Sequence, residues 1–273
     1  MQRRGRSIEQ DDLGLQERRG WAWLALALLG LAATLLWGHL SRQAAAEAEE
    51  RARLDGQARV VELNLMRQLQ GAYAAMRDVR DDLGVGTVPA GYADARLRML
   101  QRASPGVRKI NLLDAAGRVQ ASSLADDVGT DLSSQPALSR ARARPDAQLL
   151  YVSEPARSGP TGFAIDLALV RQAPGGGFGG LLQVTFDADY FQTLLASVRY
   201  ASDMRASVAH GDGVVILVDP PDPTGPGTNV LRPGSLFKAH RDSGAASSVA
   251  TGRAVLGGDL RMVALRTLQA ATL

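Results

Sequence analysis

The side chains best suited to metal binding or proton transfer at neutral pH are the three histidines, His39, His210 and His240. They lie far apart in the sequence and form no spacing typical of a metal site. His210 has an acidic neighbour in Asp212, but no nucleophile accompanies the pair, and the surrounding Gly-Asp-Gly run is typical of a turn. The chain has no cysteine, which excludes disulfides, thiolate metal sites and cysteine nucleophiles. The sequence therefore indicates no catalytic residue, no metal site and no cofactor.

Two glycine-rich runs look like nucleotide motifs, but hairpin turns explain them better. Gly257-Gly258-Asp259 begins like the GGDEF signature of cyclases, whose chemistry needs acidic metal ligands in a nucleotide-binding domain of its own. The run from Gly175 to Gly180 is followed neither by a Lys-Ser/Thr pair nor by a helix, which a phosphate-binding loop requires. Each run lies between two predicted strands, where glycine-rich turns are common.

The charge distribution argues against nucleic-acid binding. The formal charge is +3, and five of the 31 basic residues lie in the first twenty positions. No later stretch combines a Lys/Arg stripe with interleaved aromatic residues. Hydrophobic residues make up 45% and charged residues 22% of the chain, a balance typical of a globular protein.

Residues 21–40, WAWLALALLGLAATLLWGHL, contain no acidic or basic side chain apart from the titratable His39. Twenty residues at about 1.5 Å rise span a hydrocarbon core of roughly 30 Å. We predict a cytoplasmic tail over residues 1–20, a transmembrane helix over residues 21–40, and residues 41–273 in the periplasm at the inner membrane. The alternative is a cleaved signal peptide, with Ala44-Ala45-Ala46 as the cleavage site. Either interpretation moves the rest of the chain out of the cytosol.

The pattern beyond the membrane segment predicts an α+β fold with helices packed on antiparallel sheets. Apolar residues recur at steps of three and four from Leu54 to Leu83, which indicates a long helix over residues 41–84 that serves as a dimer seam, a spine against a sheet, or both. The predicted elements that follow are a helix over 93–102, a hairpin over 108–123, a helix near 135–143, strands over 148–153, 162–171 and 179–186, and a helix over 189–198. After residue 200 the pattern repeats in smaller form, with hairpins over 206–218 and 247–267.

The stretch from Tyr151 to Pro220, YVSEPARSGPTGFAIDLALVRQAPGGGFGGLLQVTFDADYFQTLLASVRYASDMRASVAHGDGVVILVDP, resembles double Cache (tandem PAS-like) sensor domains of bacterial histidine kinases and diguanylate cyclases. The resemblance extends over residues 41–273. It implies a membrane-distal subdomain over 85–200 and a smaller membrane-proximal one over 201–273 that lacks its last strand. It also implies a homodimer and a cytoplasmic output domain, a histidine kinase or a cyclase, beyond a chain that looks truncated.

The resemblance further implies a small-molecule pocket between the first sheet and the loop and helix that cross it. The residues that could line it are Arg140, Arg142, Tyr151, Ser153, Arg157 and Asp166. An arginine fork suits a carboxylate or phosphate, whereas the alternative is that these are surface arginines and ordinary strand residues. The amino-acid signature known in some double Cache domains includes a tryptophan, and none occurs after residue 37.

These observations together predict a membrane-anchored signal-input module that is not itself an enzyme. It would bind a small molecule of unknown identity and pass the signal to an absent output domain. One alternative is an anchored partner-binding or assembly protein without a small-molecule ligand. Another is an anchored hydrolase, which would need a nucleophile-base pair or a metal cluster that the sequence does not show.

Overall fold

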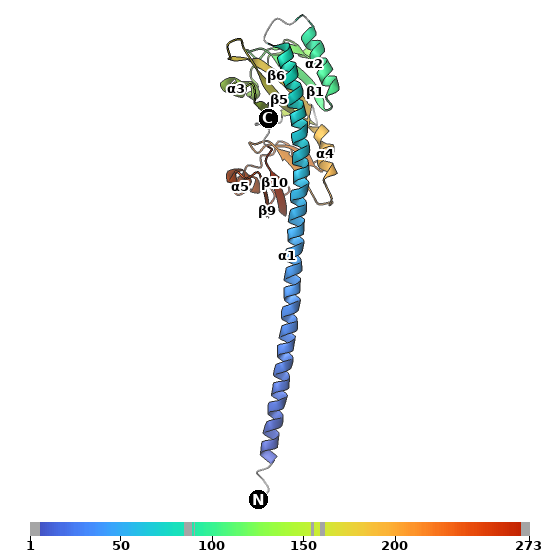
Figure 1. The fold of residues 1–273 in the computed structure, drawn as a ribbon, viewed down its shortest axis with the longest axis vertical. Helices are drawn as coiled ribbons and strands as arrows, with labels where there is room; N and C mark the ends of the chain where they lie inside the picture. Colours follow the sequence, from blue (N-terminus) through green and yellow to red (C-terminus); the bar gives the residue numbers. More distant parts are fainter. Residues whose placement is uncertain (1–5, 85–88, 90, 154–155, 159–161, 269–273) are drawn as a thin grey trace. The chain divides into compact units, whose positions relative to one another are not determined.

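The computed structural model describes residues 6–84, 89, 91–153, 156–158 and 162–268. It does not describe the side chains of residues 6–20, 22, 24, 25, 136, 156–158, 162, 163, 188 and 189. The chain divides into two units, residues 1–53 and residues 54–273. Helix α1 (Arg6–Leu83) begins in the first unit and ends in the second (Figure 1).

The first unit consists of the N-terminal part of α1. Its large apolar side chains are exposed, as for Leu35 and Trp37, and near its end Arg51 forms an ion pair with Glu47 one turn earlier. Among the described residues, no helix meets both the length and the apolar character needed to cross a membrane. The membrane span over residues 21–40 therefore stays a prediction.

The second unit is built on an antiparallel six-stranded sheet of order β2-β1-β6-β5-β3, in which β4 also pairs with β5. This arrangement confirms the predicted α+β class. The strands are β1 (Val107–Leu113), β2 (Val119–Ser122), β3 (Leu150–Val152), β4 (Ala156–Ser158), β5 (Gly162–Gln172) and β6 (Phe178–Asp187), and the helices among them are α2 (Tyr92–Ala103), η1 (Ala125–Asp127) and α3 (Pro136–Ala143).

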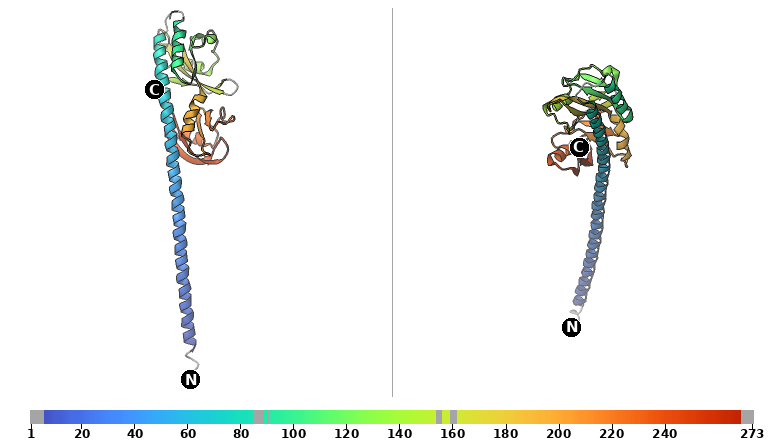
Figure 2. Two further views of the ribbon diagram at one scale, coloured as in Figure 1. Left: turned by 90° about the vertical axis from the view of Figure 1, so that its right-hand side faces the viewer. Right: turned by 45° about the horizontal axis from the view of Figure 1, so that its top comes forward.

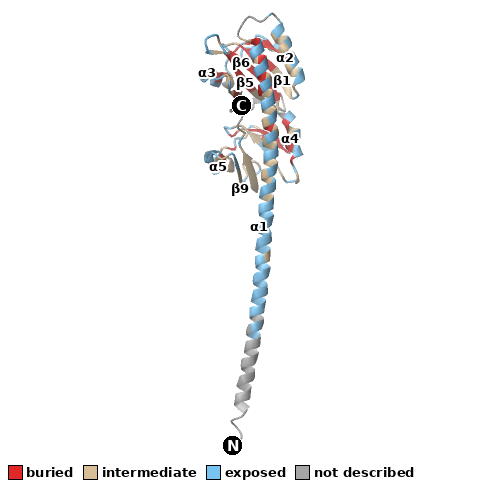
Figure 3. Cartoon of the chain, viewed as in Figure 1, coloured by how far each residue is buried: buried red, intermediate tan, exposed pale blue. Residues whose placement is uncertain are grey.

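The two faces of this sheet differ because side chains alternate along each strand. One face packs on α1 and α2, where Ile110 and Leu182 lie in an apolar cluster with Met76 of α1 (Figure 3). Figure 2 shows the C-terminal part of α1 lying along this face. The opposite face packs on α3, where Leu113 contacts the cluster that contains Leu138. We call the two surfaces the α1 face and the α3 face.

The C-terminus of α1 is held by a buried arginine. The guanidinium of Arg171, on β5, donates to the carbonyl oxygen of Gly84, the residue after the helix. The negative end of the helix dipole offsets the charge of this guanidinium, and burial lowers the pKa of Arg171. Sheet and helix are thereby joined at a point that the sequence pattern did not indicate.

The remainder of the chain forms two separate hairpins. Strand β7 pairs with β8 and β9 pairs with β10, each pair as an independent two-stranded sheet. The predicted second sheet is therefore present as two hairpins rather than as one sheet. Gly257 and Gly258 have φ angles of 88° and 73°, which confirms the turn interpretation of the Gly-Gly-Asp run. The elements are η2 (Ala188–Phe191), α4 (Gln192–Ser197), β7 (Ala206–Ala209), β8 (Val215–Asp219), α5 (Leu236–Ser243), β9 (Ser247–Arg253) and β10 (Leu260–Arg266).

Candidate ligand-binding site

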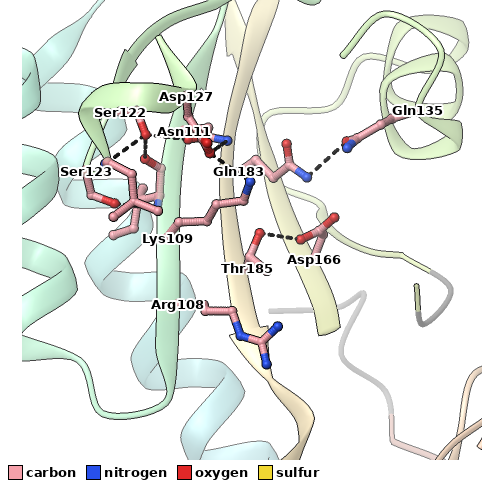
Figure 4. Close-up of polar contacts among 12 residues, drawn as sticks. Arg108, Lys109, Asn111, Ser122, Ser123, Asp127, Gln135, Asp166, Gln183 and Thr185 are labelled. Carbon is pink, nitrogen blue, oxygen red and sulfur yellow. Dashed lines mark hydrogen bonds and ion pairs between the residues drawn. The ribbon is translucent and has the colours of Figure 1, made fainter. Parts of the chain in front are cut away.

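The α3 face of the six-stranded sheet carries a group of polar side chains, drawn in Figure 4. Alternation along β1, β5 and β6 places these side chains opposite the apolar residues that pack on α1. Two further members come from the segment that crosses this face, from η1 and from the residue before α3. The group, which we call the polar patch, consists of Lys109, Asn111, Asp127, Gln135, Asp166, Gln183 and Thr185.

One end of the polar patch is a closed network. The ammonium of Lys109 lies 2.7 Å from Oδ2 of Asp127, and Nδ2 of Asn111 donates to the same oxygen at 3.4 Å. The hydroxyl of Ser122 donates to Oδ1 of Asn111 at 2.7 Å. Because Asn111 is almost fully buried, these bonds satisfy a side chain that would otherwise be costly to desolvate.

The other end of the polar patch is incompletely satisfied. The amide nitrogen of Gln183 donates to Oε1 of Gln135 at 3.0 Å, and the hydroxyl of Thr185 donates to Asp166 at 2.6 Å. Gln183 is 3% exposed, yet its side-chain oxygen has no hydrogen-bond partner within the part of the chain that the structure describes. An unpaired buried acceptor of this kind costs about 1–3 kcal/mol. This unpaired oxygen is the atom of the polar patch best suited to accept a hydrogen bond from a ligand.

Three of the predicted site residues lie at or beside this patch. Asp166 belongs to it, and Ser153 lies next to Asp166 because its backbone and hydroxyl extend the pairing between β3 and β5. Tyr151 packs against the apolar cluster beneath α3, and its hydroxyl donates to the carbonyl oxygen of Arg144. The tyrosine hydroxyl is therefore engaged by the loop after α3.

Arg140 and Arg142 do not lie together as an arginine fork in the described part of the structure. Arg142 donates to the carbonyl oxygen of Ala115 at 2.7 Å, and its guanidinium lies 5.7 Å from the ring centre of Phe178. Arg140 lies 3.6 Å from Asp212, beyond the first sheet. Arg157 is on β4, and its side chain is outside the described residues. The two described arginines thus contact different parts of the fold, Arg142 the β1–β2 turn and Phe178 of β6, and Arg140 the β7–β8 turn.

The charges of the polar patch favour a donor ligand over an anion. The one cation of the patch, Lys109, is already paired with Asp127. Asp166 accepts from Thr185, and no cation pairs with it among the described residues. The open groups are thus a carboxylate and an amide oxygen, both acceptors. Among the described residues, no group of His, Asp and Glu could hold a metal ion.

A second candidate lies on the α1 face, and sequence reasoning missed it. There, a cavity of about 620 Å³, partly open to solvent, lies between α1, the sheet and the β7–β8 hairpin. None of the predicted site residues lines it. The sequence signal for this cavity, the small residues Ala72 and Ala75 on the partly buried side of α1, is too common in helices to predict a cavity.

Comparisons with known proteins show which solved structures have a similar fold. The sequence matches no protein-family model, and a search of curated proteins finds no match. The structure is similar to the extracellular domain of rpHK1S-Z16, a protein named as a histidine kinase, with a TM-score of 0.73, 19% identity and coverage of 82% of this chain and 91% of that one. It is also similar to the ligand-binding domain of the Pseudomonas aeruginosa amino acid chemoreceptor PctC in complex with GABA, with a TM-score of 0.59, 15% identity and coverage of 78% and 90%.

A third similar structure is the periplasmic sensory domain of the Campylobacter jejuni chemoreceptor Tlp1, with a TM-score of 0.60, 10% identity and coverage of 79% of this chain and 90% of that one. At these identities the likeness concerns the fold. The chain therefore has the fold of extracellular and periplasmic sensory ligand-binding domains, as the resemblance to Cache-like sensors implies.

Proposed function

We propose that this chain is the signal-input domain of a membrane receptor and that it binds a small molecule with hydrogen-bond donors, such as an amine or amide, at the polar patch. The observation that carries the proposal is the buried side-chain oxygen of Gln183, which has no partner among the described residues and lies on the same face of the sheet as Asp166. A donor placed here would satisfy an acceptor that is costly to leave buried and unpaired. The sensory domains that share this fold make the same role reasonable for this chain.

The receptor would be anchored in the inner membrane by residues 21–40, with residues 41–273 in the periplasm, and would act as a homodimer. It would signal to a histidine kinase or diguanylate cyclase output domain and would have no catalytic activity of its own. The uncharged run from Trp21 to Leu40 supports the anchor, and the continuity of α1 with that run supports a helical path for the signal. A ligand shifts such a path only through its difference in affinity between two states.

The path would begin where α1 is tied to the rest of its unit. Arg171 binds the carbonyl oxygen that follows the C-terminus of α1, and Arg266 of β10 binds Asp55 and Glu62. The α1 helix is thus held at two separated points. A ligand that changes the conformation of the sheet would alter the contacts of α1 at both of these points.

The test is a thermal-unfolding screen of the full chain against amines, amides, amino acids, carboxylates and phosphate. A ligand present at 100 times its dissociation constant raises stability by about 2.7 kcal/mol, which corresponds to several degrees. We expect donor ligands to raise the melting temperature and simple anions to leave it unchanged.

Single substitutions test whether the ligand binds at the polar patch. Gln183→Leu and Asp166→Asn should each abolish the ligand-induced shift, whereas Gln172→Leu, an exposed position on β5, should retain it. A shift that survives both patch variants would contradict this location. A well-folded protein that no compound stabilises would instead support a partner-binding protein without a small-molecule ligand.

A further inference from the structure

The cavity on the α1 face is chemically unlike the polar patch. Its walls are mainly aliphatic and aromatic, with Met76 from α1, Leu167 and Phe186 from the sheet, and Ile216 from β8. Among its described lining residues, none is an aspartate, glutamate, lysine or arginine. The cavity is partly open to solvent, and its volume of about 620 Å³ is that of a binding cleft rather than of a packing defect.

One unpaired polar atom lies in this apolar wall. Gln68 of α1 lines the cavity, and its side-chain oxygen is buried with no hydrogen-bond partner in the described part of the chain. His210 also lines the cavity, but its Nδ1 already accepts from the backbone nitrogen of Asp212 at 3.2 Å. Ser104 and Tyr190, which carry hydroxyls, also line the cavity, so Gln68 supplies its buried unpaired acceptor but not its only polar group.

We infer that this cavity is a second binding site, which takes one uncharged, mainly apolar small molecule with a single hydroxyl or N–H donor that reaches Gln68. The volume lies within the range of small-molecule sites, about 300–1,000 Å³. A charged molecule would lose its hydration without gaining a counter-charge, because no charged side chain is present among the described lining residues. The buried, unpaired oxygen of Gln68 sets the requirement for a donor.

Occupancy of this site would act on the junction between α1 and the two parts that it packs on. The molecule would touch α1, the first sheet and the β7–β8 hairpin at once, since all three contribute lining residues. Filling the space would replace missing van der Waals contacts on each of these elements. The site is independent of the proposed ligand at the polar patch, which lies on the opposite face of the sheet.

The experiment uses the full chain and a decanol that carries a photoreactive diazirine, followed by mass spectrometry of the labelled peptides. We expect labelling of the α1 segment around Met76 and of the strands that contain Leu167 and Phe186. Unlabelled 1-decanol should reduce this labelling at least tenfold, and decanoate at the same concentration should not. This map requires no variant, so it stays informative if a substitution impairs folding.

Matched variants test the cavity wall and the Gln68 acceptor separately. Ala75→Leu, which fills the cavity, should reduce labelling at least tenfold, whereas Ala74→Leu, on the exposed side of α1, should not. Gln68→Leu should weaken competition by 1-decanol about fivefold without weakening that by decane, and Gln70→Leu should change neither.

Several results would overturn the inference. Labelling spread over exposed apolar side chains, or labelling unchanged in Ala75→Leu, would exclude binding in the cavity. Equal competition by decanol in Gln68→Leu and wild-type protein would exclude the donor requirement. If the wild-type chain sediments as a dimer and Ala75→Leu as a monomer, a second copy occupies the space and the small-molecule site is wrong.

Discussion

The second unit has a first half, with strands β1 to β6, and a second half, with strands β7 to β10, and the two differ in how their antiparallel hairpins are joined. In the first half, β6 lies between β1 and β5 and pairs with both, which joins two hairpins into one sheet. In the second half, β7 pairs only with β8 and β10 only with β9, and no strand among the described residues joins them. A central strand therefore converts two hairpins into a sheet with two well-defined faces.

Burial follows this difference in the β9–β10 hairpin, although every residue of β8 is buried. In β6, seven consecutive residues are buried, whereas β10 has no fully buried residue. Isolated two-stranded hairpins are marginally stable, so the second half must draw stability from contacts outside its own strands. Arg266 and His240 provide such contacts, and the predictions below test whether the two halves depend on different interactions.

The largest expected difference concerns the strand cores. Leu182→Ala in β6 removes a side chain with no exposed surface and should lower the free energy of unfolding by about 3 kcal/mol. Leu265→Ala in β10 removes a half-buried side chain and should cost about 1 kcal/mol. Denaturant unfolding of both variants measures the difference. Equal losses would mean that the second half has a core as tightly packed as the first.

The next effect concerns the tie between β10 and α1. Arg266 lies 2.8 Å from both carboxylate oxygens of Asp55 and 2.8 Å from Glu62, with 16% of its side chain exposed. Arg266→Met should cost about 1–2 kcal/mol, since charge-assisted bonds of a partly buried guanidinium are lost. Hydrogen exchange should accelerate in β9 and β10 and stay unchanged in β5 and β6. Arg241→Met, at an exposed position on α5, is the control and should leave exchange in β9 and β10 unaltered.

The smallest effect is a pH dependence confined to the second half. The ring of His240 lies 2.7 Å from the hydroxyl of Ser248 and 2.9 Å from that of Thr267, and burial lowers its pKa. The unfolded chain therefore binds this proton more readily than the folded chain does. The contribution of His240 to stability is fully present above its unfolded pKa of about 6.5 and declines as the pH falls toward the lower folded pKa.

Melting temperatures at pH 7.5 and 5.5 test this dependence. We expect a smaller decrease for His240→Gln than for the wild-type chain, because the variant has no imidazole to protonate. An identical decrease in both proteins would show that other groups account for the pH response.

Local patterns in the sequence predicted the elements well and their pairing only in part. The steps of three and four along residues 54–83 predicted the buried stripe of α1, and the Gly-Gly-Asp run predicted the turn between β9 and β10. These features depend on neighbouring residues, which is why they can be read from short stretches. The separation of the second half into two hairpins could not be read in this way, because strand pairing depends on residues far apart in the chain.

The candidate site shows the same division. By itself, the sequence determined an α+β chain with a long helix, antiparallel hairpins, no thiol chemistry and a group of polar residues around Tyr151 to Asp166. Only the tertiary structure decided that Gln183 and Asp166 meet on one face, that Arg140 and Arg142 point elsewhere, and that Gln68 lines an apolar cavity on the other face. The physical reason is that a side chain's partners are set by which strands become neighbours and which face each residue takes.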